Sequence, residues 1–281
     1  MSRDDQRRQA EAFRDRHRSA PLLLLPNAWD AMSARLFAAS GFAAIATSSA
    51  GVAWALGYPD GEAAPWGDVV AATARIVRAA RVPVTADIEA GYGRTPAELA
   101  ASIAAIIDAG AVGINLEDSL QRAEGPMRSI ADAAARIAAA RAAADAAGVP
   151  IVINARIDLF LRNVGEGAAR FDDAVQRGRA YLAAGADCLY PIGLADPPTI
   201  AEFVRAVAAP VNIMGRPGVP GVAELERLGV ARVTIASGPA RLAMATTRQL
   251  AESLRTTGRF DALTPALAHA EAQQLFATGD R

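Results

Sequence analysis

The sequence predicts a (β/α)8 barrel, or TIM barrel, because short apolar runs alternate with longer Ala-rich stretches. Runs typical of buried strands occur eight times, at residues 22–25, 43–47, 83–86, 112–116, 150–154, 187–191, 210–214 and 232–236. Stretches long enough for crossover helices lie between them, such as 66–80, 96–109, 130–147 and 171–184. This alternation predicts a parallel sheet, and eight such units close it into a barrel. An open doubly wound sheet is the alternative.

A finer repeat favours the barrel. Pro83, Pro150 and Pro210 begin odd-numbered strands, where a missing N–H costs no ladder hydrogen bond. A glycine instead precedes each even-numbered strand, where it suits the left-handed end of a helix. These glycines are Gly41, Gly110, Gly185 and Gly229.

Both ends of the chain extend beyond the barrel. We predict one domain, with an N-terminal helix in residues 1–20 (helical over 4–18), the barrel in 21–238 and C-terminal helices in 239–281. Good helix formers occupy 239–255 and 265–276. The last segment is not needed to close the barrel. It is therefore predicted to cap the barrel or pack on another subunit, and a loosely docked tail is the alternative.

Composition argues against several classes of protein. The net charge is -1 and no basic patch is interleaved with aromatic residues, which argues against nucleic-acid binding. No apolar run reaches the roughly 18 residues of a membrane span, and the charged start does not resemble a signal peptide. Cys188 is the only cysteine, which excludes an intrachain disulfide and a cysteine-based zinc site. We therefore expect a cytoplasmic protein without nucleic-acid or membrane partners.

Two carboxylates follow the third predicted strand. Asp87 and Glu89 are two residues apart, so an extended chain puts both on one side, and Gly91 and Gly93 let the backbone pass close by. This is a plausible site for a divalent cation. A solvated strand end is the alternative.

Polar residues end the other strands at the same edge, which is where barrels carry their sites. They are Thr47, Ser48 and Ser49 with Tyr58, Pro59 and Asp60 beyond them, Glu117 and Asp118, Asn154, Arg156 and Asp158, Tyr190, and Asn212. Several acids thus surround one arginine. Such a mouth would repel itself unless a cation or hydrogen bonds balanced it.

The types of residue at the mouth narrow the chemistry. No strand end carries His, Lys or Cys, and His17 and His269 fall in terminal helices, which argues against a catalytic triad, a Schiff-base lysine and a His-rich zinc site. Oxygen ligands alone point to Mg²⁺ or Mn²⁺. Arg156 could clamp a carboxylate or phosphate, or instead form a salt bridge to Asp158 or Glu117.

The chain resembles the isocitrate lyase and phosphoenolpyruvate mutase superfamily from Pro26 to about Ala236. The resemblance rests on the order and spacing of PNAWDAMSARLFAASGFAAIATSSAGVAWALGYPDG, TADIEAGYG, GINLEDS and INARID. It implies an (α/β)8 barrel, bound Mg²⁺, and the making or breaking of C–C or P–C bonds next to a carboxylate. It also implies a C-terminal helix swapped onto a neighbour, and hence a homodimer or homotetramer.

The resemblance also assigns roles to residues. Asp87 resembles the direct metal ligand, with Asp60, Glu89 and Glu117 holding the waters around the metal. The substrate-binding positions are Ser48, Ser49 and Ala50 for a carboxylate, Arg156 facing the bond that breaks, and Trp29 and Asp30 lining the pocket.

Two departures from the family pattern limit the reaction. Lyases of the family carry a Lys/Arg-Cys-Gly-His loop after the fourth strand, whose cysteine is the acid–base group, whereas this chain reads DSLQRAEGPMRSI. The mutase and the phosphonopyruvate hydrolase use a loop with Asn or Thr and Lys, and a His after the sixth strand, where this chain has Tyr190 and Pro191. The sequence is therefore more similar to an oxaloacetate-decarboxylase-type member.

Our hypothesis is a Mg²⁺-dependent C–C lyase or decarboxylase that acts on a small 2-oxo or 2-hydroxy dicarboxylate through an enolate. Arg156, Glu117 and Tyr190 are the predicted catalytic residues, Asn212 is a further substrate-binding candidate, and water or Tyr190 protonates the enolate. Alternatives are P–C chemistry and a non-catalytic barrel that binds a carboxylate. Residues 119–130 are expected to be mobile without ligand and to close over the substrate, where Arg122 or Arg128 meets its distal carboxylate.

Overall fold

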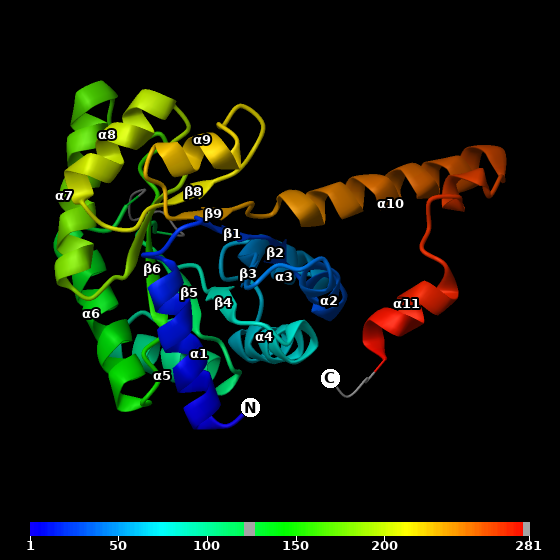
Figure 1. Cartoon of the computed structure of the whole chain (residues 1–281), viewed down its shortest axis with the longest axis horizontal. Coiled ribbons are helices and arrows are strands. Elements are labelled where there is room, and N and C mark those ends of the chain that lie inside the picture. Colours follow the sequence, from blue (N-terminus) through cyan, green and yellow to red (C-terminus); the bar gives the residue numbers. More distant parts are fainter. Residues whose placement is uncertain (121–126, 278–281) are drawn as a thin grey trace.

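The computed structural model describes residues 1–120 and 127–277 and contains a ring of parallel strands wrapped by helices (Figure 1). Its strands are β1 (Leu23–Leu25), β2 (Asn27–Ala28), β3 (Ile45–Thr47), β4 (Val84–Asp87), β5 (Gly113–Glu117), β6 (Val152–Ile157), β7 (Cys188–Pro191), β8 (Asn212–Met214) and β9 (Arg232–Thr234). One sheet has the order β2-β3-β4-β5-β6-β7 and the other β1-β9-β8. The sheets meet where β1 continues into β2 across Pro26, and where Leu189 pairs with Val211. The predicted TIM barrel is confirmed, with its first strand split at a proline that cannot donate a ladder bond.

Helices lie between and beyond the strands, and most of them surround the ring (Figure 1). They are α1 (Arg3–Arg16), α2 (Ala31–Ala39), α3 (Ser49–Ala55), α4 (Trp66–Ala80), α5 (Pro96–Asp108), α6 (Ile130–Ala146), α7 (Gly167–Ala183), α8 (Pro197–Val207), α9 (Val222–Arg227), α10 (Gly238–Thr257) and α11 (His269–Phe276). The predicted helices are present, although α7 begins four residues earlier than expected and α11 four residues later. Gly110 and Gly185, with φ of 96° and 106°, have the predicted left-handed backbone after a helix. No helix within the described residues is long and apolar enough to cross a membrane.

Helix α1 covers the N-terminal end of the barrel. Phe13 is buried and lies so close to β5 that a Cβ at Gly113 would approach its ring to 3.1 Å. Arg14 Nε forms an ion pair of 2.9 Å with Asp187 Oδ1, just before β7. These contacts tie α1 to the floor of the barrel, opposite the strand ends that were predicted to carry the site.

Polar side chains fill part of the barrel interior. Arg232 on β9 is fully buried and donates from Nη2 to Asn115 Oδ1 on β5 (3.2 Å). The same oxygen accepts from Asn154 Nδ2 on β6 (2.8 Å). Burial lowers the pKa of Arg232, because a low-dielectric interior disfavours a charge, while the negative charge of Asp87 acts in the opposite direction. A polar layer therefore lies beneath the acidic mouth.

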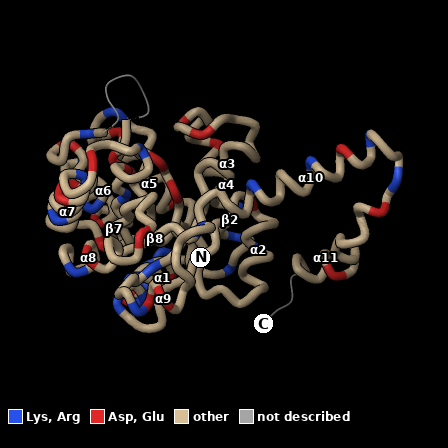
Figure 2. Tube along the Cα trace, turned by 90° about the horizontal axis from the view of Figure 1, so that it is seen from above, with Lys and Arg blue, Asp and Glu red and all other residues tan. Residues whose placement is uncertain are grey.

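The C-terminal helices form an arm that leaves the barrel (Figures 1 and 2). Ala240 is the only buried residue of α10, while Leu242 and Phe260 are 70% and 71% exposed. The arm returns to α2, where Arg35 Nε donates to the carbonyl of Leu275. Helix exchange between subunits stays a prediction.

Candidate active site

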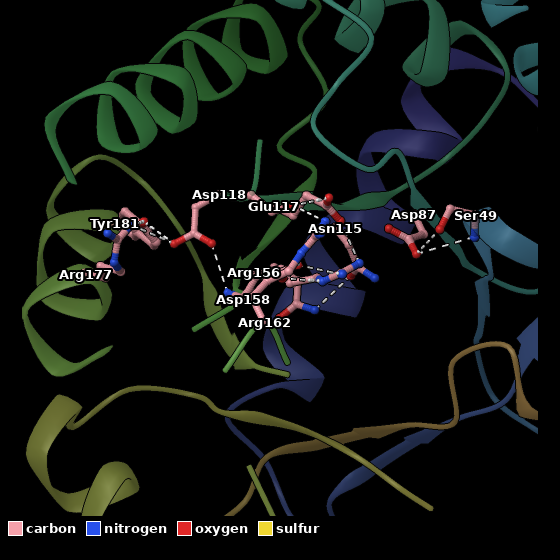
Figure 3. Close-up of polar contacts among 12 residues, drawn as sticks. Ser49, Asp87, Asn115, Glu117, Asp118, Arg156, Asp158, Arg162, Arg177 and Tyr181 are labelled. Atoms are coloured by element: carbon pink, nitrogen blue, oxygen red, sulfur yellow. Dashed lines mark hydrogen bonds and ion pairs between the residues drawn. The ribbon is translucent and has the colours of Figure 1, made fainter. Parts of the chain in front are cut away.

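Asp87 lies at the end of β4 and is held by residues that end β3 and begin α3. Its amide donates to Thr47 Oγ1 (2.8 Å), and its Oδ2 accepts from Ser49 Oγ (2.9 Å) (Figure 3). Its other oxygen, Oδ1, is buried and has no hydrogen-bond partner among the described residues. Buried carboxylate oxygens are nearly always satisfied. Oδ1 is therefore an open position for a cation or for a donor group of a ligand.

The predicted metal residues do not form a complete cage of protein ligands. Within residues 1–120 and 127–277, no three His, Cys, Asp or Glu side chains are grouped so that they could hold an ion. Mg²⁺ commonly uses one or two carboxylates and completes its shell with water and substrate. The open Oδ1 of Asp87 and the all-oxygen donor set fit that pattern, in which Asp87 would be the direct ligand.

The other predicted metal residues lie within electrostatic reach of Asp87. Burial, the Asp60 carboxylate and the Asp87 carboxylate raise the pKa of Glu89 to about 7. Burial and Asp87 also raise the pKa of Asp60, although that residue as a whole is exposed. For Glu117, burial raises the pKa and the neighbouring Arg156 opposes the increase. The site thus concentrates carboxylates whose repulsion a cation would relieve.

Glu89 is fixed by a reciprocal set of hydrogen bonds with Glu62 and Tyr92. Its Oε2 accepts from the Glu62 amide (2.8 Å) and its Oε1 from the Tyr92 hydroxyl (3.0 Å). Glu62 Oε1 in turn accepts from the Tyr92 amide (2.7 Å). We call these three residues the clasp. Because Glu62 lies two residues after Asp60, the clasp also positions the segment that carries Asp60.

Arg156 on β6 lies between two buried carboxylates. Its Nε and Nη2 donate to the two oxygens of Asp158 (2.7 and 2.9 Å), and its Nη1 lies 2.7 Å from Glu117 Oε2. Burial opposes the charge of Arg156, but Glu117 and Asp158 outweigh it and raise its pKa. The salt-bridge alternative is therefore present in the structure, with both acids. Arg156 also keeps further N–H groups that could contact a substrate.

A second arginine reaches the same network. Ser119 Oγ donates to Glu117 Oε1 (2.5 Å) and accepts from Arg162 Nη2 (3.3 Å). Arg162 Nε lies 3.8 Å from Asp158 Oδ2. Figure 3 shows Arg162 beside Asp158 and Arg156.

Asp118 does not belong to the mouth, contrary to the prediction. Its Oδ2 accepts from Arg177 Nη1 (3.1 Å) and from the Tyr181 hydroxyl (2.6 Å), both on α7. Its Oδ1 accepts from the Asp158 amide (2.9 Å). Consecutive residues at a strand end face opposite sides, so Glu117 points into the site and Asp118 toward the helices. Asp118 therefore holds the backbone of Asp158 from the side that faces the helices.

Tyr190 and Asn212 lie inside the barrel. Tyr190 is buried beside Thr234, and burial raises the pKa of its hydroxyl to about 12, so it is protonated at neutral pH. Asn212 was predicted to end its strand, but it begins β8. It is fully buried and donates from Nδ2 to Thr234 Oγ1 (3.1 Å). The predicted position of Asn212 at the mouth was wrong, because the strand begins at Asn212 and continues to Met214.

The predicted carboxylate-binding residues lie at the start of α3. Ser48 Oγ accepts from the Gly51 amide (3.2 Å) and so caps the helix, and Ala50 is buried. A Cβ at Gly51 would lie 2.7 Å from the Cβ of Trp29, so only glycine permits the close approach of the two loops. Asp30, a weaker pocket candidate, caps α2 by accepting from the Ser33 amide (2.7 Å).

The segment predicted to close over the substrate lies partly outside the described residues. Residues 121–126, which include Arg122, are not described. Arg128 Nη1 donates to Asp132 Oδ2 on α6 (2.8 Å). Arg128 is therefore engaged at the start of that helix.

Four residues of the site were not predicted, namely Glu62, Tyr92, Ser119 and Arg162. Glu62 and Tyr92 come together through left-handed backbone at non-glycine positions, which no sequence signal marks. Ser119 and Arg162 could have been found as polar residues just beyond the Glu117 and Asp158 strand ends.

Comparison with known proteins places this site in a family. Residues 13–255 match the sequence profile of the family described as phosphoenolpyruvate phosphomutase. An uncharacterised protein of Mycobacterium tuberculosis (strain ATCC 25618 / H37Rv) is 37% identical over 229 residues, covering 81% of this chain and 83% of the relative. The oxaloacetate decarboxylase of Rhodopseudomonas palustris (strain BisA53) is 31% identical over 239 residues, covering 80% and 76%.

Solved structures agree with this assignment. A Burkholderia cenocepacia J2315 protein provisionally described as a lyase/mutase has a TM-score of 0.91 and 39% identity, covering 99% of this chain and 98% of that chain. An oxaloacetate acetylhydrolase, solved with its product oxalate, has a TM-score of 0.83 and 25% identity, covering 95% and 93%.

Proposed function

This chain belongs to the phosphoenolpyruvate mutase family, and on that premise we propose that it is a Mg²⁺-dependent lyase or decarboxylase of small 2-oxo or 2-hydroxy dicarboxylates, with Mn²⁺ as a possible substitute. The expectation of a lyase of the isocitrate lyase and phosphoenolpyruvate mutase superfamily is confirmed at the level of the superfamily. Members of the family are generally dependent on a divalent metal.

The observation that carries the proposal is the open Oδ1 of Asp87 in a mouth that also contains a charged arginine. A divalent ion at Asp87 would polarise the 2-oxo group and stabilise the negative charge left when the neighbouring C–C bond breaks. Decarboxylation needs no base to begin, which suits a mouth whose predicted residues include no His, Lys or Cys. Arg156, held rigidly by Glu117 and Asp158, would orient the substrate and the developing charge.

The chain's own residues would supply the other steps. The start of α3, with Ser48, Ser49 and Ala50, would hold the carboxylate next to the reacting carbon. In a 2-oxo dicarboxylate the bond to the distal carboxylate would break with its electron pair entering the enolate, carbon dioxide would leave, and a proton would return to the carbon. In a 2-hydroxy acid the hydroxyl proton would pass to water or to a carboxylate of the mouth as the C–C bond breaks into a carbonyl product and an enolate. Tyr190 or water would give that proton, and burial keeps the Tyr190 hydroxyl protonated at neutral pH.

Product formation tests the proposal. The protein is incubated with Mg²⁺ and, separately, with oxaloacetate, methylisocitrate and alkylmalates, against a metal-free control. We expect metal-dependent product from at least one of them above the uncatalysed rate. No product from any of them would refute the proposal.

P–C chemistry is the second candidate, because the matching family profile is that of a phosphomutase. Phosphorus NMR on phosphoenolpyruvate and phosphonopyruvate discriminates it. Tight binding of a carboxylate without turnover, measured by calorimetry, would instead favour a non-catalytic binding barrel.

We also propose that the chain is a homodimer or homotetramer in which the arm packs on a second copy. The arm exposes large apolar side chains, including Leu242 and Phe260. Exposed apolar surface of this kind commonly marks a protein interface.

A further inference from the structure

Arg162 occupies a position at the mouth that none of the roles above uses. It follows β6, and its amide donates to the carbonyl of Asp158 (2.8 Å), which places the side chain beside Arg156 (Figure 3). The side chain is 38% exposed, against 12% for Arg156. Arg162 thus faces the solvent side of the site while Arg156 lies deeper.

The two arginines differ in how well their charge is compensated. Arg156 has two carboxylates, Glu117 and Asp158, within 2.7 Å. Among the described residues, the one ion pair of Arg162 is with Asp158, at 3.8 Å, and Asp158 already accepts two hydrogen bonds from Arg156. Because Coulomb attraction falls with distance, the described carboxylates compensate the charge of Arg162 less fully than that of Arg156.

The contacts of Arg162 connect it to the reacting region. Its Nη2 donates to Ser119, which donates to Glu117. Its charge also acts on Asp60: burial and Asp87 raise the pKa of Asp60, and Arg156 and Arg162 oppose that increase. Arg162 is therefore linked to Glu117 through Ser119, and its charge favours the ionised form of Asp60.

We propose that Arg162 binds the distal carboxylate of the substrate and so selects dicarboxylates over monocarboxylates. This inference rests on the proposed function, because it assumes that the other carboxylate lies beside Asp87 and Arg156. The planar guanidinium matches a carboxylate with two parallel hydrogen bonds. In a lyase reaction this carboxylate stays on a product, whereas in decarboxylation of a 2-oxo dicarboxylate it is the group that leaves as carbon dioxide.

Malate and lactate test the proposal, because they share the 2-hydroxy carboxylate and differ by the distal carboxylate. Calorimetry with Mg²⁺ measures the affinity of each for wild type, Arg162→Gln, Arg162→Lys and the control Arg170→Gln. Arg170 lies in α7, which follows the segment that carries Arg162, and it donates to the carbonyls of Val164 and Gly165.

We expect Arg162→Gln to weaken malate binding by about tenfold or more, as for loss of a charge-assisted contact, and to leave lactate unchanged. Arg162→Lys should restore part of the malate affinity, and Arg170→Gln should match wild type. If Arg162→Gln kept the wild-type preference for malate over lactate, the role of Arg162 would be overturned, while the proposed function would stand. An equal loss in Arg170→Gln would assign the effect to loop structure and overturn it too. If wild type bound neither malate nor lactate, the carboxylate site itself would fail and this inference with it.

Discussion

The amide of Tyr92 donates to Oε1 of Glu62, and both residues adopt left-handed backbone, with φ of 53° and 57°. Glu89, the third member of the clasp, has φ of 53°. Left-handed backbone costs a non-glycine residue about 1–3 kcal/mol, so the hydrogen bonds of the clasp must hold three such residues in place. Strain concentrated beside a cluster of carboxylates is typical of a functional site.

Tyr92→Phe tests the clasp. The substitution removes the hydroxyl that donates to Glu89 and keeps the amide that donates to Glu62. We expect the free energy of unfolding in urea to fall by about 1 kcal/mol, the usual net contribution of a hydrogen bond. Glu62→Ala should also lower kcat/KM, because the segment bearing Asp60 loses its anchor. As a control, Glu98→Ala removes a glutamate that caps α5, and it should leave kcat/KM unchanged.

Asp87→Asn tests the metal assignment. It keeps the size of the side chain but removes the negative charge, so we expect calorimetry to detect no Mg²⁺ binding, while Glu89→Gln only weakens it. Asp145→Asn, on the exposed face of α6, is the matched control and should bind as wild type does. Equal affinity in Asp87→Asn and wild type would mean that Asp87 is only a strand end.

Arg156→Lys tests the central arginine. Lysine keeps the charge but cannot contact both oxygens of Asp158 and also Glu117. We expect a loss of about 2–3 kcal/mol in transition-state stabilisation, measured as a fall in kcat/KM, together with a lower melting temperature. A lower melting temperature with unchanged kcat/KM would leave Arg156 with a structural role only.

His17 predicts a pH dependence of stability. Burial and the charge of Arg232 lower its pKa from 6.5 to about 3, so the unfolded chain binds the proton more readily. The free energy of unfolding should therefore fall as the pH decreases from about 6.5 toward 3, by at most about 1.4 kcal/mol per unit from this group. Urea unfolding at several pH values between 4 and 6 measures this. The free energy of unfolding of His17→Gln should change less with pH than that of wild type. His269→Gln, which changes an exposed residue of α11, should keep the wild-type pH dependence.

The molar mass in solution tests whether the arm packs on a second copy of the chain. We expect light scattering to give a dimer or tetramer for the full chain, and a smaller species for the double variant Leu242→Glu, Phe260→Glu. Arg248→Glu, an exposed position of α10 without an apolar side chain, is the control. A full chain that is monomeric would support the loosely docked tail instead.

The sequence could predict the mouth because strand ends are local features. Asp87 and Glu117 directly follow an apolar run and Arg156 lies two positions beyond one, and parallel strands bring such ends together. Asp118 was misplaced because one position along a strand reverses the face, and the pattern of acids alone does not give the register.

The clasp could not be predicted for a different reason. Glu62 lies 27 residues before Glu89 and 30 before Tyr92, and their hydrogen bonds depend on backbone angles that are unusual for these residue types. Helices α2 and α3 were not predicted either. Each follows a strand within a few residues, so the apolar periods of strand and helix merge.

The position of helix α1 determines the end of the barrel at which substrate can enter and products can leave. Phe13 and the Arg14–Asp187 ion pair cover one end, and Arg232 with Asn115 and Asn154 occupies the interior. We therefore expect substrate and products to enter and leave through the mouth at the opposite end of the barrel. A product bound at the mouth excludes the next substrate molecule, so the reaction products should be competitive inhibitors. Product release can then limit the turnover rate.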